Sequence, residues 1–291
     1  MNWTTYWVKQ RANQPIMTSL YNLNQYTEYL KDKNLSENTI RLYLNALDRF
    51  NQEFNTTNLK EHFRTNLKKY EASSLKVQQW ALNSYVKFKK LTVEWERITR
   101  LIPKTQRKFF DTISEPELEQ LKNAKVEKNL QVYERNNLIL DFLFYSGVRI
   151  NELINIKHSD WQSNQLRILG KGNKVRFVLL PEFLIKHFDL ASANYLFTNQ
   201  RGNLIKAEYI RWLLKARTEK AGIKKKITPH TFRRSFATLL YRNGAQLLTI
   251  QQLLGHSSVQ TTEKYIQNDF TYVYQDYSKL WKNNPNLSQI Q

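Results

Sequence analysis

The chain has 291 residues, and its 45 Lys and Arg against 25 Asp and Glu give a formal net charge of +20 at pH 7. It contains no cysteine, which excludes disulfides, thiolate nucleophiles and cysteine-based zinc sites. No apolar run approaches the roughly 20 residues of a membrane-spanning helix, and residues 1–14 lack the apolar core and cleavage site of a signal peptide.

The basic excess is spread over both parts of the chain. Residues 1–110 carry 19 basic and 9 acidic side chains, and residues 111–291 carry 26 and 16. An excess on both parts indicates a polyanion that is contacted from two sides, rather than a detachable basic tail. The composition therefore favours a cytoplasmic protein that binds nucleic acid. The alternative is a basic protein with no special partner.

Four helices are predicted before residue 100. The first two lie within residues 19–34 and 36–54, and the second has apolar residues at helical spacing with Ser36 as its N-cap. Two more fit residues 58–73 and 74–96. These helices predict a small all-α domain in which the interleaved aromatic residues mainly pack in the core. Stacking of these aromatics on bases or sugars is the alternative.

A basic stretch with one proline, residues 101–111, fits an extended linker. After it, Ser114 and Glu117 form a capping box that opens a helix. The strongly apolar segment 130–147 predicts a second helix that ends at Gly147. Residues 165–180 contain two strand-like runs around a glycine-rich turn, which is typical of a β-hairpin. The remainder is helical, so we expect a mainly α second part with one small hairpin.

An anion-binding helix end is predicted in TPHTFRRSFATLL, residues 228–240. Thr228 is a good N-cap, and Pro229 suits the first helical position. His230 and Arg233 share one face of the first turn, where unpaired backbone N–H groups and the positive end of the helix dipole also lie. Together these groups suit a tetrahedral anion such as phosphate. The alternative is a buried His–Arg pair bonded to a carboxylate.

Two further stretches place charged side chains beside glycines. In YSGVRINEL, Arg149 follows the glycine that ends a helix, and Glu152 is placed to hold or neutralise it. The turn GKGNK places Lys171 and Lys174 at the tip of the predicted hairpin. Each stretch alone is a weak signal of function.

A second glycine-ended helix leads to the last two candidates. In LLGHSSVQTTEKYI, His256 follows the glycine, and Tyr265 lies nine residues later. In this order, the set Arg, Lys, His-x-x-Arg, His and Tyr resembles the tyrosine recombinase (phage integrase) family. The resemblance rests on the stretches YSGVRINEL, GKGNKVRFVLL, PHTFRRSFAT, LGHSS and TTEKYI. It covers residues 112–275 and extends loosely to the N-terminal helices.

The resemblance implies a mainly α (α+β) fold. It assigns residues 1–100 to a four-helix, SAM-like core-binding domain, residues 101–111 to a linker, and residues 112–291 to a catalytic domain with a small β-sheet and a C-terminal tail helix. The chain begins almost directly with the core-binding region, without an obvious arm-binding domain. This start favours an Xer-like or transposon-resolvase-like member of the family.

The family cleaves DNA without metal, nucleotide or other cofactor. By the resemblance, Tyr265 attacks a backbone phosphate, forming a 3′-phosphotyrosyl bond and releasing a 5′-hydroxyl. Arg149 and Arg233 correspond to the two arginines that clamp the phosphate. Lys171 corresponds to the hairpin lysine that protonates the leaving oxygen, although Lys174 is an alternative on the same turn.

Two histidines and a carboxylate complete the implied site. His230 would bind a non-bridging oxygen or help to deprotonate the tyrosine, and His256 would donate to the other oxygen. Glu152 corresponds to a carboxylate that orients the site. The family often has histidine directly after the second arginine, where this chain has Arg234. Arg234 could instead reach a phosphate or a carboxylate of its own.

The implied partner is double-stranded DNA with inverted-repeat half-sites, bound by a homodimer and by a tetramer when two sites are paired. An aromatic stripe in the tail, Phe270, Tyr274, Tyr277 and Trp281, indicates a helix face that needs an apolar partner. The resemblance implies that this helix docks on a neighbouring protomer; packing on its own domain is the alternative. The expected function is integration, excision or resolution of DNA at the nucleoid. A type IB topoisomerase and a non-catalytic DNA-binding regulator are the rival functions.

Overall fold

The computed structural model describes residues 23–104, 110–162, 165–170, 175–189, 191–192 and 194–255. Lys171, Lys174, His256, Tyr265 and the C-terminal tail lie outside these residues. The chain forms two compact units, Met1–Arg107 and Lys108–Gln291, each with its own apolar core. Among the described helices, none is both long and apolar enough to cross a membrane.

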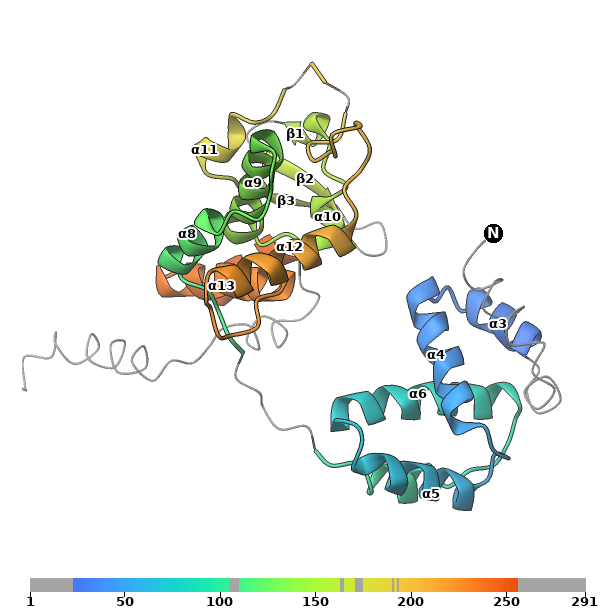
Figure 1. Cartoon of the computed structure of the whole chain (residues 1–291). Helices are drawn as coiled ribbons and strands as arrows, with labels where there is room; N and C mark the ends of the chain where they lie inside the picture. The colour runs from blue at the N-terminus through green and yellow to red at the C-terminus, as the bar shows by residue number, and fades with distance from the viewer. Residues whose placement is uncertain are drawn as a thin grey trace, which may run out of the picture. The chain divides into compact units, whose positions relative to one another are not determined.

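The first unit consists of helices only, in the part of it that is described. Its helices are α3 (Leu23–Asp32), α4 (Glu37–Phe50), α5 (Thr56–Leu67), α6 (Ala72–Phe88) and α7 (Trp95–Thr99) (Figure 1). The four expected helices are confirmed, and the side chain of Ser36 caps α4 by accepting from the N–H of Thr39.

The fourth helix was predicted to run too far. It ends at Phe88 rather than continuing to residue 96, because Lys90 adopts a left-handed conformation with φ 54°. The N–H of Leu91 then donates to the carbonyl of Val86 at 3.0 Å, which closes the helix end. Residues 95–99 form the separate short helix α7.

Aromatic residues of this unit mainly fill its core, as expected. The rings of Tyr26 and Tyr85 meet edge to face with their centroids 4.9 Å apart, and both side chains are buried. Phe50 and Phe63 are buried beside them in the same cluster. Trp80 is an exception because it is 60% exposed.

The second unit combines helices with one small sheet. Its elements are α8 (Glu115–Asn123), α9 (Leu130–Ser146), α10 (Ile150–Leu153), η1 (His158–Asp160), β1 (Trp161–Gln162), β2 (Gln165–Leu169), β3 (Val175–Val178), α11 (Glu182–Ile185), α12 (Ala207–Lys220), α13 (Pro229–Arg242) and α14 (Leu247–Leu254). The predicted capping box of Ser114 and Glu117 begins α8.

The sheet has three antiparallel strands in the order β1-β2-β3, so the predicted hairpin carries an additional strand at its edge. Leu166 pairs with Val178, and Ile168 pairs with Arg176. These four residues share the inner face of the hairpin because side chains alternate between the faces of a strand. Three of them are buried apolar residues, whereas the fourth is an arginine.

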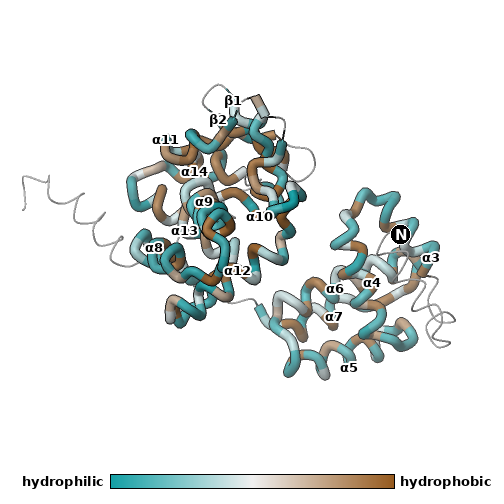
Figure 2. The backbone as a smooth tube through the Cα atoms, turned by 45° about the horizontal axis from the view of Figure 1, so that its top comes forward, coloured by the Kyte–Doolittle hydropathy of each residue, from teal (hydrophilic) through white to brown (hydrophobic). Residues whose placement is uncertain are grey.

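Helix α9 is the centre of the second unit, where it packs against α8, α10, α11 and α13 (Figure 1). Its buried side chains include Ile139, Leu140, Phe142 and Leu143. Figure 2 shows hydrophobic and hydrophilic residues alternating along the helices, as expected for helices that bury one face. The long α13 lies against α9, and this contact brings the start of α13 to the end of α9.

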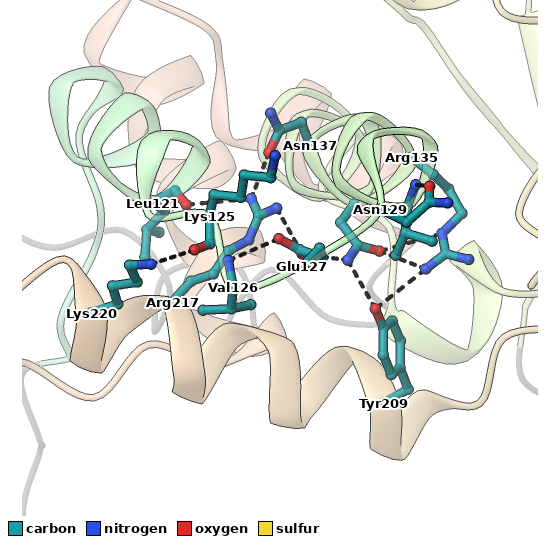
Figure 3. A network of polar contacts seen from close by, with 12 residues as sticks. Leu121, Lys125, Val126, Glu127, Asn129, Arg135, Asn137, Tyr209, Arg217 and Lys220 are labelled. Carbon is teal, nitrogen blue, oxygen red and sulfur yellow. Dashed lines mark hydrogen bonds and ion pairs between the residues drawn. The ribbon is translucent and has the colours of Figure 1, made fainter.

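A buried polar network joins α12 to the α8–α9 region (Figure 3). The fully buried Arg217 of α12 donates to Glu127 at 2.9 Å and to Asn137 at 2.5 Å. Near the other end of the helix, the hydroxyl of Tyr209 accepts from Asn136 at 2.9 Å, and Asn136 also donates to Glu127. These bonds fix α12 along its length.

Candidate active site

Arg149 is aimed by the end of α9. Gly147 ends that helix in the left-handed conformation, with φ 59°, as the sequence predicted. The chain then becomes extended at Arg149, which is the N-cap residue of α10. The Arg149 side chain is 37% exposed, so its guanidinium can contact both protein and solvent.

Arg233 is held from two sides by backbone carbonyls. The predicted cap is present: Thr228 accepts from the N–H of Thr231, and Pro229 is the first residue of α13. One turn later, Arg233 donates from Nη1 to the carbonyl of Gly147 at 2.6 Å and from Nη2 to the carbonyl of Leu254. Its side chain is buried, so its guanidinium has a fixed place between the ends of α9 and α14.

His230 lies among positive charges. Burial by surrounding atoms is the first cause that lowers its pKa, and the charges of Arg234, Arg233, Arg149 and Arg211 lower it further. The neutral imidazole is therefore the favoured form at neutral pH. Other atoms surround His230 only in part, and the residue still has substantial solvent-accessible surface, which does not fit the alternative of a fully buried His–Arg pair. The sequence candidates Arg149, His230 and Arg233 are thus brought together.

Glu152 is the acidic partner of this cluster. Its Oε1 accepts from Nη1 of Arg149 at 2.8 Å, and its Oε2 accepts from the Arg149 backbone N–H at 2.7 Å. Burial raises the pKa of this carboxyl, but hydrogen bonds and charge from Arg176, together with the bonds from Arg149, lower it to about 2. The contact expected from the spacing of Glu152 and Arg149 is present.

Two arginines near the cluster were not among the sequence candidates. Arg176 of β3 binds Glu152 at two points, with Nη1 to Oε1 at 2.7 Å and Nη2 to Oε2 at 2.8 Å. Its inward-facing position on a half-buried strand is the signal that could have revealed it. The positive charge of Arg211, on α12, contributes to the lowered pKa of His230. The sequence around Arg211 is that of an ordinary helix, so it gave no sign that this arginine differs from other surface arginines.

Arg234 contacts an aromatic ring. Its guanidinium carbon lies 3.7 Å from the centroid of the Phe110 ring, close enough for a cation–π interaction. Phe110 lies near the start of the second unit, so this contact holds the segment that precedes α8 against α13. From the sequence, a phosphate or a carboxylate was the expected partner of Arg234. The contact with an aromatic ring was not predicted.

The cluster has the chemistry of an anion site. The positive charges of four arginines lower the pKa of His230. The carboxylate of this cluster, that of Glu152, is already bonded to two guanidinium groups. Guanidinium groups suit the planar, two-point recognition of phosphate oxygens. A site of this kind can bind a phosphodiester and stabilise the additional charge of a five-coordinate phosphorus.

Comparison with known sequences identifies relatives over most of the chain. A model of the phage integrase family matches residues 111–271. The tyrosine recombinase XerC of Anoxybacillus flavithermus is 31% identical over 289 residues, which cover 87% of this chain and 96% of that protein.

Solved structures extend the likeness to the fold. The XerH site-specific recombinase, bound to a palindromic difH substrate in a post-cleavage complex, is 25% identical, with a TM-score of 0.63 over 79% of this chain and 71% of that chain. A lambda integrase dimer bound to a core site is 16% identical, with a TM-score of 0.68 over 84% of this chain and 93% of that chain. The second likeness concerns the fold, which is the mainly α architecture that the sequence predicted.

Proposed function

This chain belongs to the phage integrase family and is a site-specific DNA tyrosine recombinase, and we propose that its active site consists of Arg149, Lys171, His230, Arg233, His256 and Tyr265. The observation that carries this assignment is the convergence of Arg149, Arg233 and His230 at the ends of α9 and α13. Lys171, His256 and Tyr265 enter the proposal through the family motifs that they match.

The proposed reaction exchanges one phosphoester bond for another. The Tyr265 hydroxyl attacks the scissile phosphorus, and its proton leaves to a nearby base, for which the neutral His230 is suited. The bond to the 5′-oxygen breaks, and Lys171 delivers a proton to that oxygen. Arg149, Arg233 and His256 stabilise the charge on the non-bridging oxygens. The 3′-phosphotyrosyl bond retains the energy of the original ester, so a second DNA end can reverse the step without ATP.

The nucleophile is tested with Tyr265→Phe, which removes only the attacking oxygen. DNA fragments from the region around the gene are incubated with the protein, and covalent complexes are trapped with SDS. The wild-type protein should form such complexes, and sequencing of the trapped ends locates the cleavage site. The variant should bind the same DNA without a covalent product. Covalent attachment by the Phe variant would reject Tyr265.

The partner is proposed to be double-stranded DNA with inverted half-sites, bound as a dimer and paired as a tetramer, in the cytoplasm at the nucleoid. The XerH recombinase, which is similar over most of its length, was solved on a palindromic site. Strand exchange between two copies of the mapped site separates this function from a topoisomerase, which relaxes DNA without pairing sites. A non-catalytic regulator would give neither exchange nor covalent complex.

The tail is proposed to link protomers through its aromatic stripe. Deletion of residues 270–291 should leave binding to a single half-site nearly intact but sharply reduce cooperative binding to paired half-sites and recombination. Gel-shift titrations on one and two half-sites measure the cooperativity directly. Full-rate recombination by the truncated protein would leave the tail as a local cover of its own domain.

A further inference from the structure

Arg176 connects two parts of the candidate site that are far apart in the sequence. From β3 it binds both oxygens of Glu152, and its Nε donates to the carbonyl of Leu253 at 3.1 Å. The side chain is only 10% exposed. A buried arginine with three directed bonds has little freedom to move, so it fixes the groups that it bonds.

The first of these groups is the end of α14. The last carbonyls of a helix lack partners within the helix, and cations are favourable there. Arg176 occupies the carbonyl of Leu253, and Arg233 occupies that of Leu254. The next residue, Gly255, turns the chain with φ 63°, and a Cβ placed on it would lie 2.6 Å from Cδ of Arg176. The arginine therefore packs tightly under the turn that leads to His256.

The second group is Glu152, whose negative charge is shared. Its Oε1 accepts from both Arg149 and Arg176, at 2.8 and 2.7 Å. In the described part of the chain, two guanidinium groups bond to this buried carboxylate, those of Arg149 and Arg176. If Arg176 is removed, Arg149 is the one that is left. Arg149 would then be held by Glu152 and would be less able to bind a phosphate. A buried carboxylate whose charge is not fully balanced also destabilises the fold.

We propose that Arg176 is a positioning residue of the recombinase, which neutralises Glu152 so that Arg149 can act on the scissile phosphate and which supports the Gly255 turn at the end of α14. The inference rests on the proposed active site. Arg176 does not contact the DNA in this role. It acts through Arg149 and through the end of α14.

The test is a double-mutant cycle in which the rate of DNA cleavage is measured. The protein is saturating, each enzyme turns over once, and the DNA is designed so that the strand released by cleavage diffuses away and cannot be rejoined. Arg176→Met should lower the rate by about 100-fold, the usual cost of a small displacement of catalytic groups, with little change in DNA binding. In a Glu152→Gln background, the same substitution should cost only about tenfold, because no buried charge remains to be balanced. Arg167→Met, an exposed arginine on the neighbouring strand, is the matched control and should cleave at the wild-type rate.

A second substrate separates positioning of charge from a general loss of structure. Replacing a non-bridging oxygen of the scissile phosphate with methyl gives a neutral methylphosphonate, which depends less on guanidinium charge. The defects of Arg176→Met and Arg149→Ala should both shrink on this DNA. A defect of Arg176→Met that is equal on the two substrates would overturn the proposal.

If Arg176→Met alone does not fold, the comparison of Glu152→Gln with the double variant still tests the proposal, because the Gln background removes the unbalanced charge. A loss of about 100-fold in that background, or no loss in the wild-type background, would also overturn the positioning role. Failure of the proposed active site gives a different result. In that case Arg149→Ala would cleave normally, whatever the behaviour of Arg176.

Discussion

A Cβ atom placed on Gly147 would overlap Cδ1 of Phe236 and lie 2.9 Å from its Cγ. Phe236 belongs to the small core cluster between α13 and α14, so its ring cannot move away without disturbing that cluster. Gly147 also has φ 59°, a conformation that side chains disfavour. Two independent constraints thus require glycine at the residue whose carbonyl holds Arg233.

Gly147→Ala should therefore damage both stability and catalysis. We expect about 1–2 kcal/mol from the left-handed backbone and about 1–3 kcal/mol from the overlap with the ring, measured by urea unfolding. The cleavage rate should fall as well, because the turn positions Arg149 and the Gly147 carbonyl. Gly222→Ala is the control, since Gly222 has φ 69° but no atom within 4 Å of its Cβ position, and it should show only the backbone cost. Equal losses in the two variants would contradict the packing argument.

Arg217→Met should destabilise the second unit by about 3–5 kcal/mol, because it leaves the carboxylate of Glu127 buried without its guanidinium partner. Lys215→Met on the same helix is the control. The Lys215 side chain is 76% exposed, and its Nζ lies as far as 3.8 Å from Oε1 of Glu219. Loss of this weak surface ion pair should change the free energy of unfolding by less than about 1 kcal/mol. Urea unfolding followed by circular dichroism measures both. An Arg217 variant as stable as the control would show that the network in Figure 3 contributes little.

Binding of DNA should raise the pKa of His230. In the free protein, burial and then the four arginines lower this pKa below its usual value. A bound phosphate adds negative charge, which favours the imidazolium and shifts the pKa upward. Titration of the His230 ring protons by NMR, with and without DNA in the Tyr265→Phe protein, measures the shift. His187, whose pKa is lowered by burial and by Lys186, is the internal control and should not respond. No change at His230 would place the phosphate elsewhere.

The general acid can be identified with a sulfur-substituted substrate. A 5′-bridging sulfur leaves as a thiolate and needs little protonation. Lys171→Ala should therefore lose cleavage of ordinary DNA and recover it on the sulfur substrate, whereas Lys174→Ala should show no such recovery. The opposite result would transfer the role to Lys174.

Cleavage should survive excess EDTA, since guanidinium and imidazole groups supply the positive charge that metal ions provide in other phosphoryl-transfer enzymes. Affinity for DNA should fall steeply as salt rises, because contacts to phosphates release counterions. Covalent-complex yield in EDTA and binding titrations at several salt concentrations measure the two effects. A loss of cleavage in EDTA that added magnesium restores would count against the mechanism.

Local signals explain what the sequence could predict. The caps at Ser36, Ser114 and Thr228 depend on residues within one turn, so the starts of their helices were correct. The end of α6 was missed because its left-handed residue is Lys90, which carries no signal comparable to glycine. The short strand β1 was missed since two residues offer no alternation to detect.

The candidate site shows the same division. Glu152 was found beside Arg149 because the two are three residues apart. Arg176 was not found because its partners lie 24 and 77 residues away, and only the folded chain brings them together. The roles of Lys171, His256 and Tyr265 remain predictions that rest on the family motifs.

The bonds from Arg233 to the carbonyls of Gly147 and Leu254 have a consequence for protein synthesis. Gly147 and Arg233 stand 86 residues apart, and Leu254 follows later still. A domain folds as a unit when its chain has emerged from the ribosome. An unfinished chain that lacks the end of α14 cannot hold Arg233 between both carbonyls, even if its first unit has already folded. A chain that stops before the end of α14 therefore lacks one of the two contacts that fix Arg233.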